Sequence, residues 1–155
     1  MAVKPTIVPL LCLAILGLAL PGPSRAETAS AIGPSASMAG IWLTRGSRSQ
    51  IEIAPCGETL CGSIVWLPPE SDGGPSTARD DKNRDPALRD RLLFGLEIMA
   101  GFRPAGANQW SEGEIYNPDD GRTYEPTFTL RKDGQLEVEA CILFICQSEV
   151  WQRVE

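Results

Sequence analysis

The stretch YEPTFTLRKDGQLEVEA, Tyr124–Ala140, decides the fold class of this chain. Apolar residues alternate with polar ones on both sides of the turn sequence Lys132-Asp133-Gly134: Tyr124, Phe128 and Leu130 precede it, and Leu136 and Val138 follow it. Alternation with a period of two indicates a strand with one buried and one wet face. An Asp-Gly turn between two such runs is typical of a β-hairpin. The stretch therefore predicts two antiparallel strands that share an apolar face.

The same pattern extends outward to most of the chain beyond Gly40. A second hairpin turn, Asp119-Asp120-Gly121, separates further alternating runs. We predict eight strands, near residues 40–45, 48–54, 60–67, 92–100, 109–117, 122–131, 134–141 and 144–153. Short strands joined mostly by hairpins predict an all-β fold, an eight-stranded antiparallel up-and-down barrel. A two-sheet sandwich is the alternative.

The first 26 residues are typical of a signal peptide. Lys4 precedes an unbroken apolar run over residues 7–20, and Ser24-Arg25-Ala26 places small residues at a cleavage site. The run is shorter than the about 20 residues of a spanning helix, although a retained anchor is the alternative. Residues 27–38 are rich in Ala, Ser and Gly and predict a flexible tether. Residues 39–155 then form the single β-barrel domain.

Cleavage leaves 129 residues with 12 basic and 20 acidic side chains, a net charge of −8. This length suits one hydrophobic core. An acidic chain without a basic cluster is a poor match for nucleic acid or anionic membranes. We expect a periplasmic or secreted protein with no stable membrane insertion after signal cleavage.

Four cysteines remain after cleavage, in two pairs with the same spacing: Cys56 and Cys61, then Cys141 and Cys146. In an exported chain they favour disulfides, with three possible connectivities. Each pair brackets a hairpin connection, and in a meander these two hairpins lie at opposite ends of the barrel. Cross-pairing would then span too far, so we predict one disulfide within each hairpin. A four-thiolate zinc site is the competing interpretation.

Residues 68–91 break the strand pattern with a long, polar connection that contains several prolines. Loops of this length inside compact domains are functional or mobile, and this one is a possible contact surface for a protein partner. Its acidic residues do not match a calcium-binding helix–loop–helix, because Pro86 occupies the position of the turn glycine. A looser calcium site formed by Asp80, Asp81 and Asp85 stays open beside a turn-forming and helix-capping role.

A first-strand tryptophan and a last-strand arginine carry a specific resemblance. Gly40-Ile41-Trp42 with Arg153 is similar to the barrel closure of calycins, the lipocalin superfamily, in which the arginine packs on the indole. Further motifs resemble the exported bacterial family called domain of unknown function 2147: Cys56-Gly57, Leu60-Cys61-Gly62, Asp81-Lys82-Asn83, Gly113-x-Ile115-Tyr116 and Asp120-Gly121-Arg122-Thr123-Tyr124. The resemblance runs from about Gly40 to Val154 and implies a lipocalin-like barrel of unassigned activity.

The sequence contains few residues that could carry catalysis. The chain has no histidine, which removes histidine-dependent nucleophilic catalysis and histidine-ligated zinc. Glu97, Glu112 and Glu114 lie on predicted strands, where carboxylates of a wet face are the ordinary interpretation and an acid/base pair the alternative. We predict no enzyme, no cofactor and no metal.

Two functions remain. An eight-stranded barrel is just wide enough to be filled by side chains or to hold one small ligand. If the lumen is open, we expect a small hydrophobic ligand beside Trp66, Ile98, Tyr124 and Phe128, with Trp110 either lining the lumen or packed in the core. The alternative is an envelope protein-interaction or structural module with a filled barrel.

Overall fold

The computed structural model describes residues 38–69 and 76–154, so the predicted signal peptide and nearly all of the tether lie outside the described residues. Ten strands are present: β1 (Gly40–Leu43), β2 (Gln50–Cys56), β3 (Thr59–Trp66), β4 (Glu97–Gly106), β5 (Gln109–Ser111), β6 (Glu114–Asn117), β7 (Arg122–Tyr124), β8 (Thr127–Leu130), β9 (Leu136–Ile142) and β10 (Ile145–Arg153). Two short 3-10 helices, η1 (Arg45–Ser47) and η2 (Pro86–Leu88), lie in loops. Within this part of the chain, no helix has the length and apolar character to cross a membrane.

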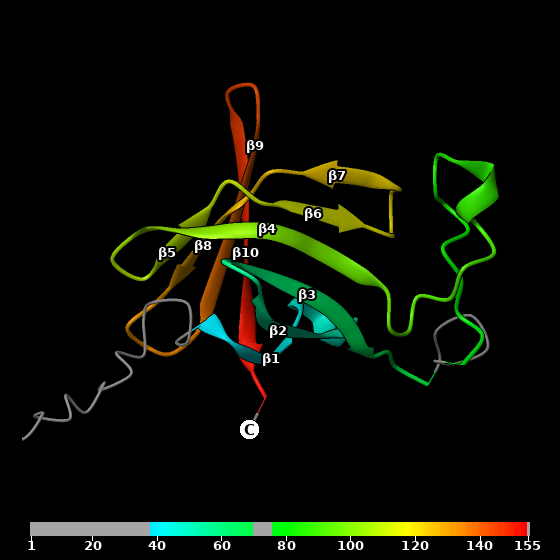
Figure 1. Ribbon diagram of the computed structural model, residues 1–155, viewed down its shortest axis with the longest axis horizontal. Helices are drawn as coiled ribbons and strands as arrows, with labels where there is room; N and C mark the ends of the chain where they lie inside the picture. Colours follow the sequence, from blue (N-terminus) through cyan, green and yellow to red (C-terminus); the bar gives the residue numbers. More distant parts are fainter. Residues whose placement is uncertain (1–37, 70–75, 155) are drawn as a thin grey trace, which may run out of the picture. The chain divides into compact units, whose positions relative to one another are not determined.

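The strands close into an antiparallel barrel (Figure 1). Their order is β3-β2-β1-β10-β9-β8-β5-β4, and β4 pairs back onto β3. On its other edge β4 pairs with both β5 and β6, while β7 pairs with β6 and β8 with β5. Thus β5 with β6, and β7 with β8, each act as one interrupted strand. The prediction of an eight-stranded up-and-down barrel is confirmed, and the sandwich alternative is wrong because the sheet closes on itself.

The two interruptions have local causes. Between β5 and β6, Glu112 adopts a left-handed backbone with φ of 65°, which no regular strand accommodates. Between β7 and β8 stands Pro126, which has no backbone N–H to give to a neighbouring strand. Both predicted hairpin turns are present, Asp119–Gly121 between β6 and β7 and Lys132–Gly134 between β8 and β9.

The fourth strand differs from its predicted position. It was predicted over residues 92–100 and runs over Glu97–Gly106, because a turn precedes it in which Gly95 has φ of 79° and the Leu96 N–H donates to the Leu93 carbonyl. The inward residue is therefore Met99, which is fully buried against Gly62. Its neighbour Ile98 is also buried, at 8% exposed, and belongs to the same hydrophobic core.

The contact predicted at the barrel closure is present. Trp42 and Arg153 are register partners between β1 and β10, and the guanidinium carbon lies 4.3 Å from the centre of the indole. Arg153 Nη1 donates to the Ala39 carbonyl at 2.9 Å, and Trp42 Nε1 donates to the Met38 carbonyl at 2.9 Å. Gly40 leaves room for this cation, since an added Cβ would lie 2.5 Å from Nη1.

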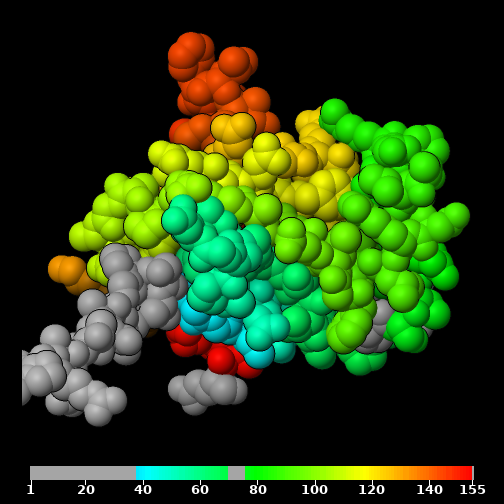
Figure 2. Space-filling model, in the orientation of Figure 1, coloured from blue at the N-terminus to red at the C-terminus, as the bar shows by residue number. Residues whose placement is uncertain are grey.

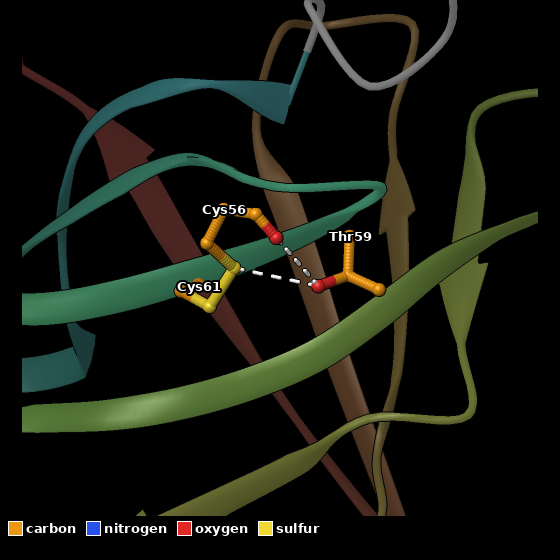
Figure 3. The surroundings of a disulfide bond; sticks show 3 residues. All are labelled: Cys56, Thr59 and Cys61. Carbon is orange, nitrogen blue, oxygen red and sulfur yellow. Dashed lines mark hydrogen bonds between the residues drawn. A yellow bond between two sulfur atoms is a disulfide. The ribbon is translucent and has the colours of Figure 1, made fainter.

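Both cysteine pairs form the predicted disulfides within their own hairpins, Cys56–Cys61 across β2 and β3 and Cys141–Cys146 across β9 and β10. Beside the first bridge, the Thr59 hydroxyl donates to the Cys56 carbonyl at 3.2 Å (Figure 3). A zinc site would need free thiolates, which disulfides do not offer, so the zinc alternative is wrong.

Large side chains fill the interior. The ring of Phe128 packs edge-on against Phe102 at 4.8 Å and against Trp151 at 5.6 Å between ring centroids. Phe102, Phe128, Trp42 and Trp110 have no solvent exposure at all. These rings lie inside an eight-stranded barrel, a size that has room for side chains or for one small ligand.

Candidate functional site

The loop that joins β3 to β4 is held to the barrel by a polar group that we call the loop cluster: Asp80, Asn83, Arg91 and Tyr116. Asp80 is completely buried and Asn83 is 6% exposed, and no other polar or charged side chain in the described residues is buried to this degree. Buried carboxylates and amides are costly unless hydrogen-bonded, so this loop has a specific anchor.

The loop folds locally so that these side chains meet. The Asp80 N–H donates to the Arg91 carbonyl at 3.1 Å, which brings the two arms of the loop together. Between them, the Asp85 carboxylate accepts from the Ala87 N–H at 2.9 Å and caps η2, whose first residue is Pro86. Proline at this position has the backbone angle that a helix start requires.

Most hydrogen bonds in the loop cluster converge on the Asp80 carboxylate, and one more joins Asn83 Nδ2 to the Tyr116 hydroxyl at 2.9 Å. Oδ1 accepts from the Tyr116 hydroxyl at 2.6 Å. Oδ2 accepts from Asn83 Nδ2 at 2.7 Å and from Arg91 at 2.9 Å through Nε and 2.8 Å through Nη2. The Arg91 guanidinium also lies 5.2 Å from the centre of the Tyr116 ring. Both oxygens of the buried Asp80 carboxylate thus accept hydrogen bonds from side chains of the loop cluster.

The β6–β7 turn completes the anchor through Gly121. An added Cβ at Gly121 would lie 2.1 Å from the Lys82 carbonyl oxygen, so the loop backbone rests directly on the turn. Three motifs of the sequence thereby come together in space: Asp81-Lys82-Asn83, Gly113-x-Ile115-Tyr116 and Asp120-Gly121-Arg122-Thr123-Tyr124. Their shared role in this structure is to fix the loop against β6 and β7.

We expect Gly121→Ala to lower the free energy of unfolding by about 2–3 kcal/mol, because it adds a backbone clash to the strain of a left-handed φ. Gly134→Ala is the matched control, since Gly134 also has a positive φ and no neighbouring atom within 4 Å. This control should lose only about 1 kcal/mol. Urea unfolding measures both, and equal losses would contradict a close contact at Gly121.

Two tyrosines make the fold sensitive to alkali. Burial, with the hydrogen bond and negative charge of Asp80, raises the pKa of Tyr116 above its ordinary value of 10.0. The hydrogen bond to Asp120 is the main cause that raises the pKa of Tyr124. The folded state therefore holds these protons more tightly than the unfolded chain does, and stability is lost as pH rises beyond about 10.

We expect Tyr116→Phe to cost about 1 kcal/mol at pH 8, because Asp80 and Asn83 lose a partner. Above pH 10 the same variant should lose stability less steeply than the wild type, since it lacks one of the two tyrosines whose pKa is raised in the folded state. Thermal unfolding between pH 8 and 11 measures this, and parallel curves for the two proteins would contradict the assignment. Tyr124→Phe provides the companion measurement.

The residues predicted to bind a ligand are not brought together. Phe128 lies in the packed core and Trp66 is half-buried at the end of β3. Ile98 lines a pocket of about 110 Å³ on β4 and β6, together with Glu97 and Glu114. Tyr124 borders an open groove of about 780 Å³ beside the β9–β10 hairpin. The first pocket contains two of the three glutamates considered as an acid/base pair, and both are exposed.

The looser calcium site does not form. Asp80 is directed to Arg91 and Tyr116, Asp85 caps η2, and Asp81 is exposed. Across the described ranges, the ligand atoms that lie within 4.8 Å of one another belong to Glu139, Cys141 and Cys146. These cysteines are disulfide-bonded, so they do not supply thiolates.

A closed eight-stranded barrel with an arginine stacked on its first-strand tryptophan defines a lipocalin-like protein. The chain is similar to a solved Helicobacter pylori protein, HP1028, described as belonging to the lipocalin family, with a TM-score of 0.65 and 21% sequence identity over 76% of this chain and 82% of that one. The chain itself belongs to the family described as "uncharacterized protein conserved in bacteria (DUF2147)", whose model matches residues 40–153. No curated protein matches it.

One feature of the surface was not predicted. Ile142, Leu143, Phe144 and Ile145 are 56%, 88%, 98% and 71% exposed at the end of the β9–β10 hairpin. The signal was present in the sequence as four consecutive apolar residues between two cysteines. The run was predicted as the hairpin connection that Cys141 and Cys146 bracket, and its apolar exposure was not considered, because apolar residues usually indicate core.

Proposed function

We propose that this protein is exported and works as an interaction module, a filled lipocalin-like barrel that binds a protein partner at its loop end. The observation that carries the proposal is the packed interior, in which Phe102, Phe128 and Trp110 are fully buried. If side chains fill the lumen, a partner binds on the outer surface of the barrel. The two hairpin disulfides agree with an oxidising compartment.

The loop offers a surface that is both fixed and exposed. The loop cluster anchors residues 80–91, and the cost of ordering this segment is thus met before any partner arrives. Leu88, Leu92 and Phe94 remain 39%, 42% and 52% exposed beside Arg84, Arg89 and Asp90. Apolar groups surrounded by charges of both signs are typical of protein–protein contact surfaces.

Site-specific photo-crosslinking in the producing cells tests the proposal. A photoreactive residue in place of Phe94 should give one discrete crosslinked species. The same residue in place of Glu58, on the β2–β3 hairpin at the other end of β3, should give none. Excess unlabelled wild-type protein should compete, whereas Asp80→Ala protein, with its loop released, should not. Equal crosslinking from both positions, or none from Phe94, would reject the loop as the binding surface.

A second candidate is binding of a small amphipathic ligand outside the lumen. The groove of about 780 Å³ places the Tyr124 ring with Arg84 and Arg122, beside apolar Ile142 and Leu143. Such a lining suits an acyl chain with an anionic head. Native mass spectrometry of gently purified protein tests it. A mass excess that disappears on denaturation and in Arg122→Glu supports the groove, and a bare wild-type chain rejects it.

A further inference from the structure

The end of the β9–β10 hairpin has an exposure that folding alone does not explain. We call residues Ile142–Ile145 the apolar tip; the Cys141–Cys146 disulfide closes it at its base. Phe144 is 98% exposed and Leu143 is 88% exposed, whereas the exposed large hydrophobic side chains in the described part of the β3–β4 loop, Leu88, Leu92 and Phe94, reach 52%. A contiguous exposed apolar patch indicates a binding surface or a membrane contact.

The hairpin extends away from the rest of the barrel. β8 pairs with β9 only as far as Glu139, and β1 pairs with β10 at Gln152 and Arg153. Beyond Glu139 toward the turn, the described pairings of β9 and β10 are with each other, down to Ile142 and Ile145. Figures 1 and 2 show this ribbon standing out from the surface, with residues 141–146 as an isolated projection.

The apolar side chains surround the tip rather than covering one face of it. Ile142 and Ile145 are cross-strand partners and share a face of the ribbon. Leu143 and Phe144 form the two-residue turn itself, where the chain reverses. The result is a convex apolar end, which suits a medium that encloses it on all sides better than it suits a flat protein surface.

Size and depth also favour lipid over protein. The exposed surface of the four residues is roughly 600 Å², less than the about 800 Å² that each partner buries in a stable protein pair. A strand rises about 3.3 Å per residue, so the turn stands roughly 7–10 Å beyond the disulfide. Interfacial segments bury their apolar groups about 5–10 Å deep in a bilayer.

The chemistry of the tip matches the hydrocarbon edge of a membrane. Within the tip, Ile142 and Ile145 pair with each other across the hairpin, so their backbone groups have partners that lipid cannot supply. Below the disulfide the exposed residues turn polar at once, with Glu139 on one strand and Gln147 and Ser148 on the other. The tip has no charge. Charges of both signs lie near it, with Glu139 on β9 and with Arg84, Arg122 and Glu125 on the groove that Ile142 and Leu143 border, so the tip has no single-sign patch to select anionic lipid.

We propose that the apolar tip inserts into the outer part of a zwitterionic phospholipid bilayer and holds the barrel at the membrane surface. The disulfide keeps the ribbon closed in a region where no third strand supports it, since an isolated hairpin is only marginally stable in water. Insertion of one tip is reversible and leaves the barrel outside the membrane. The proposal does not depend on the loop that binds a partner.

Flotation of the oxidised mature protein with phosphatidylcholine–phosphatidylethanolamine vesicles tests the proposal. The wild type should float with the vesicles. Phe144→Asp should partition into the vesicles about 10- to 100-fold less, because it removes the aromatic ring that would be buried in the bilayer. Phe94→Asp is the matched control, an exposed phenylalanine on the β3–β4 loop that should float as the wild type does. In Phe144→Trp protein, bromine-labelled acyl chains should quench the added indole.

Four outcomes would overturn the proposal. The first is a wild type that stays with the soluble fraction, and the second is an equal loss in both aspartate variants. The third is flotation only with anionic vesicles, which would assign binding to charge. The fourth is a wild-type dimer without vesicles that Phe144→Asp dissociates, which would assign the tip to a second copy of the chain.

Discussion

Phe128→Ala will lower the free energy of unfolding by about 3–5 kcal/mol and open a cavity in the middle of the barrel. Phe128 has no exposed surface and packs edge-on against both Phe102 and Trp151. Removing its ring deletes buried apolar contacts and leaves a void that the surrounding strands refill only in part. Urea unfolding at constant pH measures the loss.

The same variant tests whether the wild-type lumen is filled. A benzene-sized apolar probe should raise the melting temperature of Phe128→Ala protein and leave that of the wild type unchanged, because an engineered apolar cavity binds such molecules. Phe94→Ala, at an exposed site, should lie within about 0.5 kcal/mol of the wild type. If Phe128→Ala does not fold, Phe128→Leu provides the smaller step. A loss below 1 kcal/mol for Phe128→Ala would show that the ring is not part of a packed core.

Asp80→Ala will cost about 3 kcal/mol and release the β3–β4 loop. The substitution leaves Tyr116, Asn83 and Arg91 without the carboxylate that accepts from all three. Unsatisfied donors at a buried site retain their desolvation cost after their partner has gone. Because Arg91 is about one-third exposed, water recovers part of its loss.

Limited trypsin digestion distinguishes release of the loop from general destabilisation. In Asp80→Ala protein, cleavage after Arg84 and Arg89 should accelerate under conditions in which the barrel stays folded, because local opening exposes the chain. Asp81→Ala is the matched control, a neighbouring carboxylate that is exposed and should change stability by less than about 0.5 kcal/mol. Similar digestion of the two variants would contradict the anchor at Asp80.

The strands, their order and the two disulfides were predicted from local sequence patterns. Alternation over residues 124–140 and its counterparts elsewhere predicted the strands, because the side-chain period of a strand is a local property. The strand count with hairpin turns predicted the order, and the order predicted the pairing of cysteines within each hairpin. These inferences concern neighbours along the chain or successive hairpins, and the structure confirms them.

The predicted bounds of the fourth strand were wrong because glycine residues interrupt the alternating pattern there. Gly95 delays the start of β4, and the backbone of Gly101, with φ of 80°, lies between the two inward residues Met99 and Phe102. Strict alternation predicts one inward residue of each neighbouring pair, namely Ile98, whereas the structure buries both Ile98 and Met99. The positive φ angles that cause such shifts depend on packing and are not evident from an alternating pattern.

The order of the strands and the two hairpin disulfides follow from residue spacing, because strand period and hairpin length are short-range properties of the chain. Closure into a barrel rather than a sandwich depended on the pairing of β4 with β3. Three other features exist only in the folded protein. The buried Asp80 accepts a hydrogen bond from Tyr116, which lies 36 residues away along the chain. Phe128 packs against Phe102 and Trp151 because these rings meet across strands, which alternation does not specify. The apolar tip is exposed because β9 and β10 extend beyond the strands that pair with them. This extension depends on the lengths of the paired strands in the closed barrel.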